Sequence, residues 1–166
     1  MVRLVKMLQA TGLRIDGVGI QAHWGLDYPS FADIDAAIDA YAALGVKVMI
    51  TELDVDVLPL SKEGQIVGTA LTQPQFQLPE LKRFLDPYRD GLPASVQQQL
   101  AARYAEIFRL LHAKRDKIAR VTFWGLHDGV SWKNERPVPN RTNYPLLFDR
   151  QLQPKPAFFA VLGAAR

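Results

Sequence analysis

Apolar residues recur along the chain in two alternating patterns, one of helical and one of strand periodicity. VRLVKMLQATG is typical of the last turns of an amphipathic helix that Gly12 ends, and a chain that opens inside a helix suggests a truncation. A short strand is predicted near residues 15–22, followed by a helix that Ser30 caps and Gly45 ends. The next segment, VKVMITELDVDVLP at residues 46–59, begins as a continuous β-branched run, which predicts a buried strand.

The second half of the chain continues this alternation after a long connection. Residues 55 to about 92 are rich in Pro and Gln and predict an irregular loop. A helix is predicted from about Ala94 to His112, then a third strand with its exit loop in RVTFWGLHDGVSW, and a short last helix in KPAFFAVLGAA. Strands that alternate with helices predict the α/β class, with parallel strands and crossover helices.

Acidic residues interrupt the strand at residues 46–59. Glu52, Asp54 and Asp56 occupy alternate positions, and alternate residues of a strand share a face, so Glu52 and Asp54 would project together. In a (β/α)-barrel the carboxyl ends of the strands carry the active site. We therefore expect the carboxylates at the open end of a barrel and not in its core. Other polar or aromatic residues follow the neighbouring predicted strands: Gln21, His23, Trp124, His127, Asp128 and Trp132.

Composition narrows the possible functions. The 166 residues suffice for one domain that buries about two thirds of its unfolded surface. A net charge of +3 with mixed signs argues against a nucleic-acid groove, and no apolar run approaches the roughly 20 residues that span a bilayer. The absence of Cys excludes disulfides, thiolate zinc sites and a cysteine nucleophile, but it does not fix the cellular compartment. Neither HxH nor HExxH occurs, so no metal or other cofactor is expected.

Four segments carry a family resemblance: DGVGIQAH, VMITELDV, VTFWGLHDGVSW and PLLFDRQLQPKPAF. In this order they resemble the closing part of glycoside hydrolase family 10, the endo-β-1,4-xylanases. The resemblance implies that residues 1–166 form a single partial catalytic domain, the last three βα units of a (β/α)8 TIM barrel. It implies retaining hydrolysis of internal β-1,4-xylosidic bonds in xylan or xylo-oligosaccharides. Members of this family are often secreted.

The resemblance also implies roles for individual residues. Glu52 corresponds to the catalytic nucleophile of the family, and His23 and Asp54 to its hydrogen-bonded support. An imidazole between the two carboxylates can donate to Glu52 while Asp54 orients the ring. Without the resemblance, the pattern favours solvated residues at a loop start for Glu52 and Asp54, which is usual for acidic residues after strands, and core or loop anchors for the two tryptophans. The candidate sugar contacts are Gln21, Trp124, Trp132, His127, Arg141 and Asn143, the last two within a segment expected mainly to pack the loop.

The catalytic set implied by the resemblance is incomplete. The family's general acid/base is the Glu of an Asn-Glu pair at the fourth barrel strand. That strand has no counterpart here, and nothing around Glu80 or Glu135 supports either as a substitute. Three alternatives therefore remain: a xylan hydrolase, a carbohydrate-binding fragment without turnover, and a structural remnant. Since about three strands would leave both sheet edges unpaired, we also expect a homo-oligomer, either a dimer or a tetramer.

Overall fold

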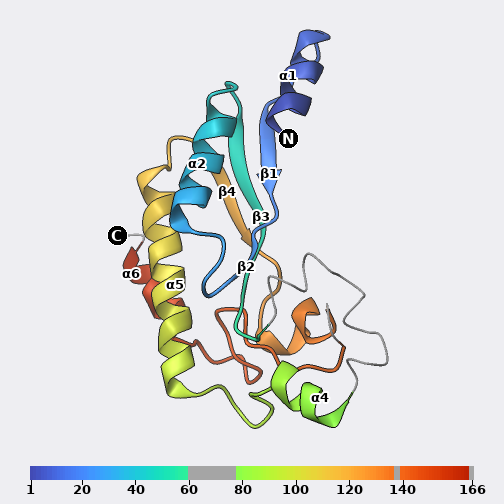
Figure 1. Ribbon diagram of the computed structural model, residues 1–166. Helices are drawn as coiled ribbons and strands as arrows, with labels where there is room; N and C mark the ends of the chain where they lie inside the picture. Colours follow the sequence, from blue (N-terminus) through green and yellow to red (C-terminus); the bar gives the residue numbers. More distant parts are fainter. Residues whose placement is uncertain (60–77, 137–138, 165–166) are drawn as a thin grey trace.

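The computed structural model describes residues 1–59, 78–136 and 139–164, and the side chain of Lys82 lies outside this description. Helices and strands alternate along the chain (Figure 1). The strands are β1 (Gly17–Ile20), β2 (His23–Gly25), β3 (Lys47–Asp56) and β4 (Ile118–Phe123). The helices are α1 (Val2–Ala10), α2 (Phe31–Ala42), α4 (Pro79–Leu85), α5 (Ala94–Ala113) and α6 (Pro156–Ala164), with the 3-10 helices η3 (Asp128–Val130) and η4 (Trp132–Asn134).

The sheet is parallel throughout and is organised around β3. β1 and β4 pair with the two sides of β3, and β2 pairs with its last three residues. β1 lies within the strand predicted near residues 15–22, and β2 begins one residue beyond the predicted end. They are separated at Gln21 and Ala22, where Ala22 has a φ of +69°. The loops of residues 124–136 and 139–150 and helix α4 lie beyond the carboxyl ends of the strands (Figure 1), which is the end where barrels place their sites.

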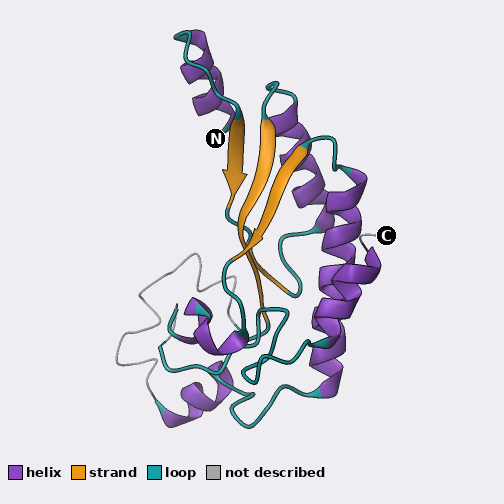
Figure 2. Ribbon diagram, turned by 180° about the vertical axis from the view of Figure 1, so that it is seen from behind, coloured by secondary structure: helices purple, strands orange, loops and turns teal. Residues whose placement is uncertain are grey.

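The apolar core lies between the sheet and two helices. α2 and α5 cover one face of the sheet, as both ribbon views show (Figure 1, Figure 2). Ser30 caps α2 as predicted, because its Oγ accepts a hydrogen bond from the Asp33 N–H at 3.1 Å. In both helices the buried residues recur at helical spacing and form the face toward the sheet, with Ile34 and Ile38 in α2 and Leu100, Tyr104, Ile107 and Leu111 among those of α5. Fully buried side chains of this core include Ile38, Val48, Ile50, Leu53, Leu100, Tyr104 and Ile107.

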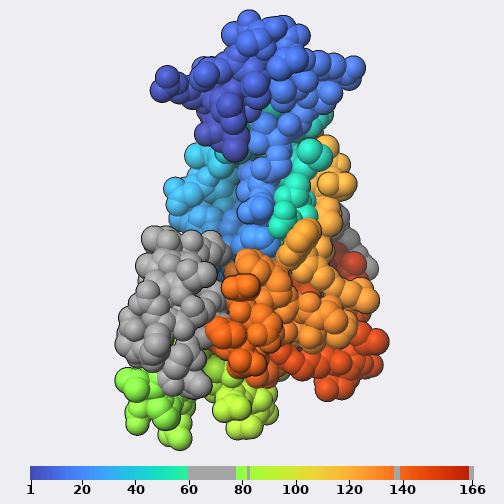
Figure 3. Space-filling view, turned by 90° about the vertical axis from the view of Figure 1, so that its right-hand side faces the viewer, coloured from blue at the N-terminus to red at the C-terminus, as the bar shows by residue number. Residues whose placement is uncertain are grey.

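The opposite face of the sheet has no helix packed on it among the described residues. The residues on this face are small or half-buried. Gly17 lies close to Met49 and Gly19 close to Thr51, so that a Cβ added to either glycine would touch that neighbouring side chain. In Figure 3, β1 and β3 form part of the molecular surface below α1. All-parallel sheets are normally covered on both faces. This sheet is therefore a sector of a barrel whose inner face is open as far as residues 1–59, 78–136 and 139–164 are concerned.

The long connection differs from the expectation of an irregular loop from 55 to about 92. β3 continues to Asp56, because its last residues pair with β2, and helix α4 forms within the segment. Residues 60–77 of the expected loop lie outside the described residues. The sequence missed α4 because a seven-residue helix flanked by Pro and Gln has too few turns for a clear periodicity.

Candidate active site

Strand register brings together the three residues predicted to be catalytic. β2 and β3 pair so that His23 lies opposite Asp54, and Glu52 precedes Asp54 by two residues on β3. The imidazole of His23 lies between the two carboxylates. Its Nδ1 is 3.1 Å from Asp54 Oδ1, and its Nε2 is 3.1 Å from Glu52 Oε2. A ring that carries a proton on both nitrogens donates to both carboxylates at once.

Burial distinguishes the two carboxylates of this set. The Glu52 side chain is 21% exposed, His23 is 13% exposed and Asp54 is fully buried. Gln21, predicted to contact sugar, lies at the exposed end, and its amide donates to Glu52 Oε1 at 3.4 Å. Glu52 therefore keeps more open side-chain surface than His23 or Asp54, and His23 links it to the buried Asp54.

The two candidate sugar-stacking tryptophans flank His23. The Trp132 ring centroid lies 4.7 Å from that of His23, and the Trp124 centroid lies 6.4 Å from it. Both indoles are well exposed, at 37% for Trp132 and 46% for Trp124. The Trp132 Nε1–H also donates to Asp54 Oδ2 at 2.8 Å. Exposed aromatic faces beside a carboxylate suit the flat C–H faces of pyranose rings.

Asp56 belongs to a buried polar cluster behind the site. Its Oδ1 accepts from Asn143 Nδ2 at 2.8 Å and from the Leu58 N–H at 2.9 Å, and its Oδ2 lies 3.5 Å from Lys133 Nζ. Asn143 is fully buried. Nearby, Arg141 is 4% exposed and donates to the carbonyl oxygens of Pro59 and Leu85. Because Arg141 and Asn143 are buried among protein groups, they hold the loop, and we do not propose sugar contact for them.

A second ion pair holds the exit loop of β4. Asp128 is fully buried, and its carboxylate accepts from Lys155 Nζ and from the Leu146 N–H, both at 2.9 Å. Burial raises the pKa of the Asp128 carboxyl although Lys155 opposes the shift, and burial lowers the pKa of Lys155. His127, next in the loop, is half-buried, and its Nδ1 accepts from the Gly129 N–H at 3.2 Å.

Sequence reasoning missed the buried lysines of these two clusters. Lys133 and Lys155 are 1% and 6% exposed, although lysine is among the residue types least often buried. The position of Lys155 between two prolines was the only local signal, since its partner lies 27 residues away. Charge patterning alone cannot find such pairs, because the partners meet only when the loops fold.

Among the described residues, the site holds one carboxyl group besides that of Glu52. Asp54 is the one carboxylate that these residues bring into the hydrogen-bonded set around His23 and Glu52. Glu80 lies exposed in the first turn of α4, and Glu135 lies exposed after η4, where it accepts from the Asn140 N–H. Within the described ranges there is no group of three His, Asp or Glu that could hold a metal, and no helix long and apolar enough to cross a membrane.

Parallel strands with helices on one face and a carboxylate-imidazole-carboxylate set at their carboxyl ends define part of a (β/α)8 barrel of the glycoside hydrolase class. Residues 1–164 match Glycosyl hydrolase family 10, and the chain belongs to this family. The predicted family and partial TIM-barrel fold are thus confirmed.

Individual relatives agree with this assignment. The endo-1,4-beta-xylanase A of Xylanibacter ruminicola is 43% identical over 155 residues, 93% of this chain and 40% of that protein. The endo-1,4-beta-xylanase of Geobacillus stearothermophilus is 40% identical over 163 residues, 96% of this chain and 42% of that protein. A solved GH10 endoxylanase from a sugarcane soil metagenome superposes with a TM-score of 0.84 at 42% identity, over 99% of this chain and 44% of that one. The chain thus spans about 40% of the length of the curated relatives it matches.

Proposed function

We propose that this chain supplies the nucleophile side of a retaining glycoside hydrolase site that acts on internal β-1,4-xylosidic bonds, with Glu52 as the nucleophile. The observation that carries the proposal is the path from buried Asp54 through His23 to partly exposed Glu52. A retaining enzyme needs such a carboxylate, held in one orientation, to attack the anomeric carbon and form a glycosyl-enzyme. The buried end of the path fixes the imidazole, and the imidazole fixes Glu52.

The proposed sugar contacts lie at the exposed side of this path. Trp124 and Trp132 offer aromatic faces, and the Gln21 amide lies beside Glu52, where it can bond a sugar hydroxyl. His127 stays a candidate because it is half-buried in the same loop as the tryptophans. Xylan or xylo-oligosaccharides are the proposed substrates, which agrees with the xylanase names of the relatives.

Covalent trapping tests the role of Glu52 directly. A 2-fluoro xyloside with an activated leaving group should label the wild-type chain, and peptide mass spectrometry should find the sugar on Glu52. The matched control is Glu52→Gln, which keeps the size of the side chain and removes the carboxylate. No adduct under conditions that label an intact xylanase, or an adduct on another residue, would refute the assignment.

The resemblance provides no counterpart for the family's acid/base Glu, and this makes a second test possible. Loss of a general acid or base typically costs about 10²- to 10⁴-fold in rate, and an aryl leaving group needs protonation least. The chain should therefore hydrolyse aryl xylosides better than xylan. Equal and strong hydrolysis of both substrates would contradict the absence of an acid catalyst.

A carbohydrate-binding function without turnover is the second candidate. The exposure of both indoles favours it, because sugar stacking needs no carboxylate. Binding of xylo-oligosaccharides that Trp124→Ala and Trp132→Ala weaken, without any release of reducing sugar, would select this alternative over hydrolysis. A chain that neither binds nor cleaves them would be a structural remnant.

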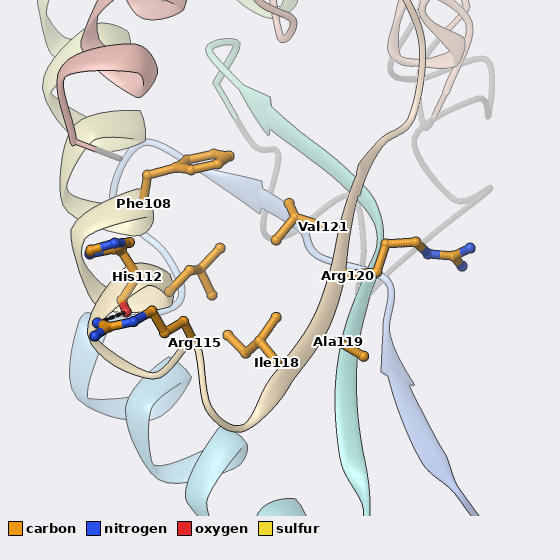
Figure 4. A pocket seen from close by; sticks show the side chains of 8 residues that line it. Phe108, His112, Arg115, Ile118, Ala119, Arg120 and Val121 are labelled. Atoms are coloured by element: carbon orange, nitrogen blue, oxygen red, sulfur yellow. Dashed lines mark hydrogen bonds between the residues drawn. The ribbon is translucent and has the colours of Figure 1, made fainter. Parts of the chain in front are cut away.

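The open sheet also supports assembly of this chain into a homo-oligomer, most simply a dimer. β1 and β4 each pair with β3 on one side. Within the described part of the chain no strand pairs with the other side of either one, so these two edges can accept a strand from a second chain. Beside β4, a groove of about 230 Å³ lies against α5, with Phe108, Ile118 and Val121 in its lining (Figure 4). Unpaired strand edges and apolar grooves both favour association. Light scattering at micromolar concentration should give at least twice the 18.6 kDa of one chain, and a stable monomer would contradict the proposal.

A further inference from the structure

The geometry points to a second role for Trp132 beyond that of a sugar platform: its indole N–H positions the support of the nucleophile. Trp132 Nε1 donates to Asp54 Oδ2 at 2.8 Å, and Asp54 Oδ1 lies 3.1 Å from His23 Nδ1. His23 Nε2 lies 3.1 Å from Glu52. The hydrogen-bonded path therefore begins at the sugar platform and ends at the nucleophile. This inference rests on the proposed function of Glu52, and it deepens that function.

The burial of Asp54 makes the indole N–H necessary. Asp54 is fully buried, so water does not take the place of a lost donor at its surface. Each carboxylate oxygen has one side-chain partner, His23 on one oxygen and Trp132 on the other. A buried carboxylate oxygen without a donor is costly, so the carboxylate would rotate or shift to find another. Such a movement displaces the oxygen that holds the His23 ring.

The 3-10 helix η4 is held so that the indole meets Asp54. Lys133, the next residue, is 1% exposed, with its Nζ 3.5 Å from Asp56 Oδ2 and 5.2 Å from the Trp132 ring centroid. Asn134 follows and donates to the carbonyl oxygen of Asp128 at 2.9 Å. Consecutive residues of η4 thus contact alternate carboxylates of β3. The indole is held in place before any sugar arrives, as positioning requires.

Trp124 provides a matched comparison in the same site. It also flanks His23 and is exposed, but its indole N–H has no hydrogen-bond partner within the described part of the chain. Trp→Phe removes the N–H and keeps an aromatic face at either position. Only the change at Trp132 removes a donor from Asp54. A difference between Trp132→Phe and Trp124→Phe therefore isolates the hydrogen bond from the stacking surface.

The direct measurement is nitrogen-15 NMR of the histidine rings in the full chain. The chain has three histidines, His23, His112 and His127, so selective labelling gives few signals, and His23→Ala identifies the one of interest. We expect Trp132→Phe to change the His23 Nδ1 and Nε2 shifts and to leave those of His112 unchanged. Trp124→Phe should change the Nδ1 shift of His23 much less. If Trp132→Phe does not fold, replacement of Trp132 by β-(3-benzothienyl)alanine removes the N–H at almost unchanged shape.

Kinetics on an aryl xyloside provide the second readout. A hydrogen bond to a buried charge is commonly worth a factor of about 10 to 100, so Trp132→Phe should lower kcat by that factor with a smaller change in KM. Trp124→Phe should act mainly on KM. Unchanged His23 shifts in Trp132→Phe, or a loss confined to KM, would overturn the inference and leave Trp132 as a platform only. If the wild-type chain hydrolyses nothing, the proposed function fails, and the NMR comparison still decides the positioning role.

Discussion

Replacement of Lys155 by Met should destabilise the protein far more than the loss of an ordinary lysine. Lys155 is 6% exposed, and its Nζ donates to Asp128 Oδ2 at 2.9 Å and to the carbonyl oxygens of Tyr144 and Leu146 at 2.7 Å. Met keeps most of the apolar stem but removes the charge and all three donors. Asp128, which is fully buried, would be left as an unpaired charge.

The magnitude follows from that unpaired charge. Removing one partner of a buried ion pair typically costs about 3–5 kcal/mol of unfolding free energy. For a chain of this size, such a loss lowers Tm by roughly 6 to 20 °C. Burial raises the pKa of Asp128 and lowers that of Lys155 in spite of their attraction, so the intact pair adds little net stability. The penalty for Lys155→Met therefore comes mainly from Asp128 left alone.

Urea unfolding and thermal melts test this reasoning on four proteins: the wild type, Lys155→Met, the double variant Lys155→Met with Asp128→Asn, and Arg14→Met. Lys155→Met should show the full loss, and the double variant with Asp128→Asn should regain a large part of it, because no buried charge then remains. Arg14→Met is the control, since its ion pair with Asp16 is exposed and should contribute nothing measurable. A loss below about 1 kcal/mol for Lys155→Met, or a double variant no more stable than the single one, would refute the argument.

Two further predictions concern coupled groups. His23→Ala and Asp54→Ala should each lower kcat/KM on an aryl xyloside. The double variant should lose little more activity than the less active of the two single variants, because both residues support Glu52 through the same hydrogen-bonded path. Additive losses would contradict such a shared path. Hydrogen bonds from Lys114, and to a smaller extent from Lys117, hold the pKa of the Asp39 carboxyl below its usual value. The ionised Asp39 carboxylate therefore contributes to stability at neutral pH, and this contribution is lost as pH falls through the lowered pKa. Melting curves from pH 7 to pH 3 should therefore converge between wild type and Asp39→Asn at the acid end, and parallel curves would exclude the effect.

The local elements were predictable from the sequence because their signals are local. The Ser30 cap, the apolar face of α5 and the β-branched start of β3 each depend on residues within a few turns of one another. The split of the first strand at Ala22 was not predictable, since alanine rarely adopts a φ of +69° and pairing with β3 stabilises it there. Hydrogen bonds from Glu52 N to Gln21 O and from Asp54 N to Ala22 O keep the ladder continuous across the break.

The site was predictable from resemblance more than from pattern. Alternation placed Glu52 and Asp54 together, but only the register of β2 against β3 places His23 between them. The bond from Trp132 to Asp54 spans 78 residues of sequence, and nothing local marks its donor. Arg141 and Asn143 were candidates for substrate contact because polar residues near a site attract that interpretation. Both are buried, and their hydrogen bonds go to protein groups of neighbouring loops, so their burial does not support sugar contact.

The three alternating carboxylates of β3 differ in what surrounds them, and this difference determines which one can react. Asp56 is 1% exposed and already accepts hydrogen bonds from Asn143 and from a backbone N–H, and Asp54 is fully buried between His23 and Trp132. Moving either one toward a sugar would break bonds to a buried charge, which are worth about 1.5–3 kcal/mol each. Glu52 keeps 21% of its side chain exposed while His23 holds one of its oxygens. A strand can therefore end in three neighbouring acids when donors hold each of them separately, and the acid with the remaining open surface, Glu52, is the one we propose for nucleophilic attack.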